Sequence, residues 1–162
     1  MKAHSALDSV QIEHALIGGI ALATLGLNRA TADVDLMIDG EYKEKAKEAL
    51  KKEGFVLKTE TKEVLHFEGT GYLDILLANR PLSKEMLKNS VVRSKLPIKC
   101  LQPEDIIGLK IQAYINDKSR ELQDKADIKK LFETHPDMDM NKIKKYAELF
   151  NQWNVVRRLK KD

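Results

Sequence analysis

The chain has a single cysteine, Cys100, among its 162 residues. One thiol excludes both an internal disulfide and a zinc site built from several cysteines, and it is typical of a reducing compartment. Long apolar runs are also missing. No segment approaches the length that spans a membrane, and the N-terminus has no apolar signal core. We therefore expect a cytoplasmic protein with no membrane partner.

The chain also lacks a large excess of either charge, and it has few aromatic residues. The formal net charge is only +3, and 6% of residues are aromatic. A basic RNA-binding domain with an aromatic stacking platform is therefore the least favoured interpretation. The chain is long enough to bury a real core, and its composition is typical of a globular protein.

The most informative stretch is an alternating strand with two acids on one face. Val34, Leu36 and Ile38 alternate as the buried side of a strand. Asp33 and Asp35 share the opposite face, with α-carbons about 6.6 Å apart, which is twice the rise per residue of a strand. Magnesium prefers carboxylate oxygens, so this pair is a candidate site for one ion or for two ions about 3.5–4 Å apart.

Two glycines come shortly before these acids. Gly18 and Gly19 end an apolar strand over 13–17 and precede a short helix expected at 20–25. Glycine lets the backbone approach a ligand closely, and helix N-termini favour phosphates. The pattern suits a metal-bound nucleoside triphosphate. The alternative is a glycine turn followed by solvated acids.

A third acid interrupts the next apolar strand. Residues 72–78 are apolar on both faces except at Asp74, which predicts a central strand covered on both sides. A lone carboxylate there is costly unless a cationic group meets it. The alternative is a strand-end aspartate on a hairpin. His66, on a strand over 64–67, either points toward the site or lies on the strand surface. His4 and His14 are either ligands or polar surface residues, and we expect the surface position for both.

A lysine occupies the inward side of a later helix that starts at Pro103. The neighbours of Lys110 at helical spacing, Ile106, Ile107, Ala113 and Tyr114, are all apolar or aromatic. Such a lysine either extends its amine to an edge, forms a structural ion pair, or contacts an anion.

The combination of these motifs carries a resemblance. Gly18-Gly19, thirteen intervening residues and Asp33-Val34-Asp35 resemble the signature of the DNA polymerase β-type nucleotidyltransferase superfamily. Arg29 and Thr31, just before the acids, resemble its minimal, AbiEii-like branch. The resemblance implies transfer of a nucleoside monophosphate from a nucleoside triphosphate to an acceptor, with Mg²⁺ or Mn²⁺ as cofactor and pyrophosphate as product.

The resemblance also implies roles for individual residues. Asp33 and Asp35 would hold metal, and Asp74 would complete the metal site and could take the proton of the acceptor. Gly18 and Gly19 would cradle the phosphates, and Lys110 and Arg29 would neutralise charge. Arg29 has an alternative role as the ion-pair partner of Asp33 or Asp35. Asp127, in a later segment that resembles another motif of the branch, would orient Lys110, act on the acceptor, or be a plain solvated acid.

We expect an α/β protein with a small mixed sheet flanked by helices. Residues 1–101 would form the nucleotidyltransferase core, and residues 102–162 a helical lobe packed on it as one compact unit. AbiEii-type toxins are usually longer, so the acceptor stays open between RNA, protein and a small molecule, and a toxin with an antitoxin partner is one reading. The alternative function is a non-catalytic nucleotide-binding or interaction module on the same fold.

Overall fold

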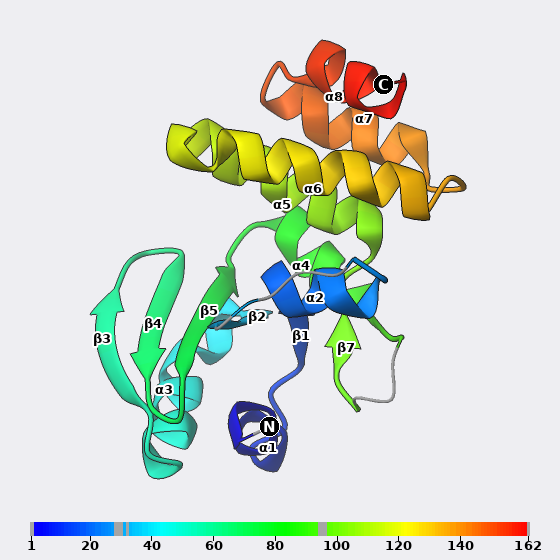
Figure 1. Cartoon of the computed structure of the whole chain (residues 1–162). Coiled ribbons are helices and arrows are strands. Elements are labelled where there is room, and N and C mark those ends of the chain that lie inside the picture. The colour runs from blue at the N-terminus through cyan, green and yellow to red at the C-terminus, as the bar shows by residue number, and fades with distance from the viewer. Residues whose placement is uncertain (1, 28–30, 32, 94–96, 162) are drawn as a thin grey trace. The chain divides into compact units, whose positions relative to one another are not determined.

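The computed structural model describes residues 2–27, 31, 33–93 and 97–161 (Figure 1). These form two compact units. The first comprises Met1–Thr24 and Asn28–Leu101, and the second comprises Leu25–Leu27 and Gln102–Asp162. Arg29, an expected nucleotide ligand, lies outside the described residues. Each unit is described by itself below.

A mixed seven-stranded sheet organises the first unit. Its strand order is β3-β4-β5-β2-β1-β7-β6. The pairs β2–β5 and β1–β7 are parallel and the other pairs are antiparallel. This confirms the predicted α/β class, a mixed sheet flanked by helices. The elements are α1 (Lys2–Ser9), β1 (His14–Ile17), α2 (Gly18–Thr24), β2 (Asp33–Asp39), η1 (Gly40–Tyr42), α3 (Lys43–Lys52), β3 (Val56–Glu60), β4 (Val64–Glu68), β5 (Tyr72–Ala78), α4 (Pro81–Lys88), β6 (Val91–Val92) and β7 (Lys99–Cys100).

The two faces of the central strands differ in exposure. On one face of β4 and β5, residues Leu65, Leu73 and Ile75 are fully buried. On the other face Asp74 is half-buried and Tyr72 is 60% exposed. The expectation that this strand is covered on both sides is therefore wrong. The strand is amphipathic, and its apolar run reflects apolar residues at partly exposed positions.

Helix ends follow local backbone chemistry. Gly54, predicted to stop α3, has φ +87° and donates its N–H to the Lys51 carbonyl, as in a Schellman cap. Asn151, with φ +56°, ends another helix in the same way and splits the single last helix expected from residue 141 into two. The helix expected from Ser83 instead begins at Pro81, since Arg80 is its N-cap.

The strand expected over 91–101 is replaced by two short strands, β6 and β7. Both residues of β6, Val91 and Val92, are exposed. Because neither side chain is buried, β6 gains no stabilisation from core packing that would favour a longer strand. Cys100 in β7 is buried, as expected, and burial raises the pKa of its thiol.

The second unit is helical. It contains α5 (Pro103–Asn116), η2 (Lys118–Arg120), α6 (Glu121–Thr134), α7 (Met140–Leu149) and α8 (Trp153–Lys161). Pro103 is the first residue of α5, as the sequence predicts. A Cβ at Gly108 would lie 2.7 Å from the Tyr146 ring, so α5 and α7 pack closely at this point. None of the described helices is long and apolar enough to cross a membrane.

His14 differs from its expected surface position. Its side chain is only 7% exposed, its Nδ1 lies 2.7 Å from the Ile12 carbonyl oxygen, and its Nε2 lies 2.7 Å from Nδ1 of His4. Desolvation, opposed by the Ile12 hydrogen bond and reinforced by His4, lowers the pKa of His14. The folded environment therefore favours the neutral form of His14 relative to the unfolded chain.

We predict that this histidine makes the protein less stable in mild acid. The unfolded chain takes up this proton as pH falls through about 6.5, whereas the folded chain takes it up only at lower pH, so stability falls as pH drops below about 6.5. His14→Asn keeps a donor near Nδ1 but does not titrate. The difference in unfolding free energy between wild type and His14→Asn should shrink from pH 7.5 to pH 5 in urea titrations. A constant difference would contradict a depressed pKa.

Candidate functional site

Asp35 and Asp74 occupy paired positions on neighbouring strands. Parallel pairing of β2 with β5 sets Asp35 opposite Asp74, and neighbouring strands lie about 4.8 Å apart. Asp33 shares their face because it is two residues before Asp35. The three acids therefore line one partly exposed face, here called the acid row.

Gly18 lies directly against the acid row. Ile17 at the end of β1 pairs with Asp35 of β2, and Gly18 follows with φ +62°. A Cβ on Gly18 would lie 2.0 Å from Oδ2 of Asp35. Both the backbone conformation and the space therefore require glycine at this position.

Gly19 and Thr31 extend the same cluster. A Cβ on Gly19 would lie 2.7 Å from the Thr31 side chain. The Thr31 hydroxyl in turn accepts a hydrogen bond from the Asp33 backbone N–H at 3.3 Å. Asp33 itself is exposed. The structure thus gathers Gly18, Gly19, Thr31 and two acids of β2 in one place.

His66 is a site residue that sequence reasoning did not select. It is opposite Asp74 in the antiparallel pair β4–β5, and its Nδ1 lies 2.7 Å from Oδ1 of Asp74. The alternation of β4 puts His66 on the face away from Leu65 and Phe67, which a sequence can show. The pairing that sets it beside Asp74 depends on the strand register, which the sequence pattern does not reveal.

The donor set of the acid row suits a hard divalent cation. Three carboxylates offer only oxygen ligands, which Mg²⁺ and Mn²⁺ accept. Within the described part of the chain, no three His, Cys, Asp or Glu side chains already surround one point as metal ligands. The metal-binding and catalytic roles of Asp33, Asp35 and Asp74 therefore stay predictions.

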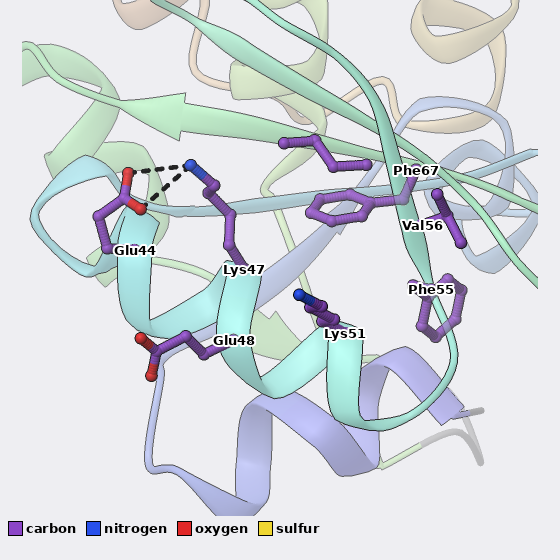
Figure 2. A pocket seen from close by; sticks show the side chains of 8 residues that line it. Glu44, Lys47, Glu48, Lys51, Phe55, Val56 and Phe67 are labelled. Carbon is purple, nitrogen blue, oxygen red and sulfur yellow. Dashed lines mark hydrogen bonds and ion pairs between the residues drawn. The ribbon is translucent and has the colours of Figure 1, made fainter.

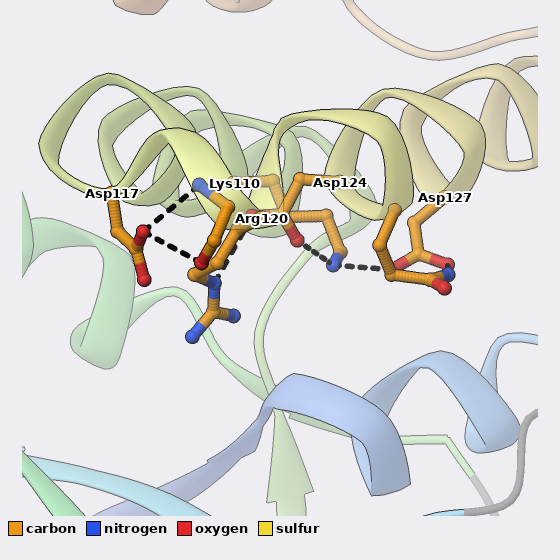
Figure 3. A network of polar contacts seen from close by, with 7 residues as sticks. Lys110, Asp117, Arg120, Asp124 and Asp127 are labelled. Carbon is orange, nitrogen blue, oxygen red and sulfur yellow. Dashed lines mark hydrogen bonds and ion pairs between the residues drawn. The ribbon is translucent and has the colours of Figure 1, made fainter.

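Lys110 lies in the second unit and is held by two acids (Figure 3). Its amine is 2.8 Å from Oδ1 of Asp124 and 2.5 Å from Oδ2 of Asp127. All three side chains are at most 8% exposed. Arg120 also contacts Asp124, and Gln123 donates to Asp127. The structure thus shows the structural ion pair that the sequence left open, with Asp127 as a partner of Lys110. A triphosphate contact of Lys110 stays a prediction.

A cavity of about 440 Å³ lies elsewhere in the first unit, between α3 and β3 (Figure 2). Lys47, Lys51 and Phe55 contribute to its lining, together with Phe67. Phe67 and His66 are successive residues of β4 and point to opposite faces. The cavity therefore opens on the face away from the acid row and contributes nothing to it.

Comparison with known families supplies the assignment. The model of the family described as aminoglycoside-2''-adenylyltransferase matches residues 1–81, half of the chain. The chain belongs to this family. It is therefore a nucleotidyltransferase, which confirms the superfamily that the glycine and aspartate motifs resemble. The match does not extend to the AbiEii-like branch.

The chain is also similar in fold to several solved structures. ANT(2'')-Ia in complex with adenylyl-2''-tobramycin is 17% identical, with 99% of this chain and 93% of that chain covered and a TM-score of 0.60. An antigenic nucleotidyltransferase-like protein from Paracoccidioides brasiliensis is 19% identical, with 99% and 90% covered and a TM-score of 0.57. A putative nucleotidyltransferase from Thermotoga maritima is 14% identical, with 75% and 86% covered and a TM-score of 0.56. Comparison with curated proteins gave no match.

The contact between Gly18 and Asp35 generates a testable expectation for the family motif. Gly18→Ala should displace the Asp35 side chain and destabilise the first unit by about 2–4 kcal/mol, since overpacking adds to left-handed strain. Gly54→Ala is the matched control. It has φ +87° but no atom within 4 Å of its added Cβ, so it should cost only the left-handed strain, about 1–2 kcal/mol. Equal losses in chemical denaturation would contradict the close approach.

The Lys110 cluster predicts a loss of stability on neutral substitution. Lys110→Met leaves two buried carboxylates without their cation, which should cost about 3–5 kcal/mol in the unfolding free energy. Lys130→Met removes an exposed pair with Glu133 at 2.8 Å and should cost less than about 1 kcal/mol. If Lys110→Met kept its stability and lost triphosphate affinity in calorimetry, the lysine would be a ligand and not a structural cation.

Proposed function

We propose that the protein transfers a nucleoside monophosphate from a nucleoside triphosphate to a hydroxyl group of a small acceptor, in a reaction that depends on magnesium. The observation that carries this proposal is the acid row beside Gly18, in which Asp35 and Asp74 are register partners. Family membership supports the reaction class, and the nucleotidyltransferase fold of the neighbours agrees with it.

In this proposal each part of the cluster has one task. Asp33, Asp35 and Asp74 would hold one or two divalent ions. When bound, such ions supply positive charge that stabilises the triphosphate and the departing pyrophosphate. The backbone at Gly18 and Gly19 would approach the phosphates, since no side chain stands between.

The chemistry would be an in-line displacement at the α-phosphorus. The acceptor oxygen forms the new bond as the bond to pyrophosphate breaks, and the proton of the acceptor hydroxyl passes to Asp74. A carboxylate can take this proton as a general base. Asp74 is suited to the task because its side chain is 37% exposed and so open to a substrate.

Family membership is most informative about the identity of the acceptor. The family is described by adenylyl transfer to the 2'' position of aminoglycosides, and the ANT(2'')-Ia structure contains adenylyl-2''-tobramycin. We therefore propose a polyhydroxylated small molecule as acceptor. Nothing in the described structure favours a toxin or an antitoxin partner. Transfer of nucleotide to RNA or protein would instead support a toxin.

Asp35→Asn should separate function from stability. The change keeps the size of the side chain but removes the charge that binds metal, so transfer from labelled triphosphate should fall by about 1,000-fold or more. Loss of one like charge from the row should leave the unfolding free energy within about 1 kcal/mol of wild type, or raise it. Transfer is measured with aminoglycosides, total RNA and protein as acceptors, with and without Mg²⁺.

Asp39→Asn is the matched control on the same strand. Asp39 caps η1 and lies 3.1 Å from the Lys84 amine, so its change should lower stability slightly and leave transfer intact. An Asp35→Asn protein that unfolds would make this acid structural. A wild type that binds triphosphate with Mg²⁺ but modifies no acceptor would favour the non-catalytic nucleotide-binding module.

A further inference from the structure

His66 is the one imidazole in contact with the acid row in the described part of the chain. Its Nδ1 lies 2.7 Å from Oδ1 of Asp74, and the two side chains are 42% and 37% exposed. His66 pairs with Asp74 across β4–β5, and Asp74 pairs with Asp35 across β5–β2. The three strands are neighbours in the sheet (Figure 1), so His66, Asp74 and Asp35 form a continuous line on one face.

We propose that His66 is a positioning residue for Asp74. Its Nδ1–H donates to Oδ1 of the carboxylate, which fixes the orientation of Asp74 and leaves Oδ2 for the metal ion or the acceptor proton. This inference rests on the proposed function, because Asp74 needs a fixed orientation only if it acts there.

The physical need for such a residue follows from the charges in the row. A carboxylate rotates easily about its last torsion, which has a broad, two-fold profile. Asp35 and Asp74 are register partners on adjacent strands, so their like charges repel each other when no cation is bound. A donor on the opposite side, from β4, holds the carboxylate in place before the substrate arrives. Outer partners of this kind typically change affinity or activity by 10- to 100-fold when removed.

The competing explanation is an ordinary cross-strand surface pair. Such pairs contribute only modestly to sheet stability and have no consequence for chemistry. The Lys58–Glu68 pair, at 2.9 Å across β3–β4, is an example in the same unit. The two explanations differ in whether the position of one donor atom affects turnover.

Two amide substitutions test that difference. The amide nitrogen of His66→Asn occupies nearly the place of Nδ1 and can still donate to Asp74. The amide of His66→Gln reaches instead to the place of Nε2. We expect His66→Gln to lower kcat by about 10- to 100-fold, with the KM for triphosphate nearly unchanged. His66→Asn should recover most of the rate, and Lys58→Gln should match wild type.

A spectroscopic measurement on the wild type needs no turnover. In ¹⁵N-resolved spectra of the imidazoles, His66 should carry its ring hydrogen on Nδ1, and Asp74→Asn should shift this signal. Added Mn²⁺ should broaden the His66 ring signals more strongly than those of His14, which lies on the opposite face of the sheet. Asp35→Asn should weaken the broadening.

The outcomes separate this inference from the proposed function. If wild type binds Mn²⁺ and transfers nucleotide, but His66→Asn and His66→Gln have the same kcat, the positioning role of His66 is wrong and the proposed function stands. The role is also wrong if Mn²⁺ binds without broadening His66. If wild type neither binds Mn²⁺ nor transfers nucleotide, the proposed function fails and this inference fails with it.

Discussion

The pairing of β2 with β5 is the constraint on which the candidate site depends. A slip of one residue would turn every side chain of β2 to the other face and would separate Asp35 from Asp74. The apolar residues that follow the acids on both strands prevent that slip. Leu36 and Ile75 are fully buried and pair with each other one position after the acids. Burial of the hydrophobic core on one face therefore positions the acids on the other.

The glycine pair and the acids form a single unit of structure although thirteen residues separate them. Gly18 has no room for a side chain because the Asp35 carboxylate occupies that space, and Gly19 stands in the same relation to Thr31. The two halves of the sequence motif are thus in direct contact in the fold. Lys110 is different, since the two carboxylates around its amine come from its own helical unit.

The sequence predicted the parts of this fold that local patterns decide. Strand alternation located β2, an apolar run located β5, Gly54 ended α3, and Pro103 began α5. It failed where pairing between distant residues decides the outcome. The partner of Asp74 is His66, and the second face of β5 is partly exposed. The register that brings these groups together arises from the assembled sheet.

The most direct test of the acid row is a crystal structure of the wild type with Mn²⁺ and a non-hydrolysable nucleoside triphosphate. Anomalous scattering would locate the ion. We predict at least one Mn²⁺ within about 2.0–2.3 Å of carboxylate oxygens of Asp35 and of Asp33 or Asp74, with phosphate oxygens beside Gly18 and Gly19. A triphosphate and ion bound elsewhere in the protein, with these carboxylates uncoordinated, would contradict the assignment.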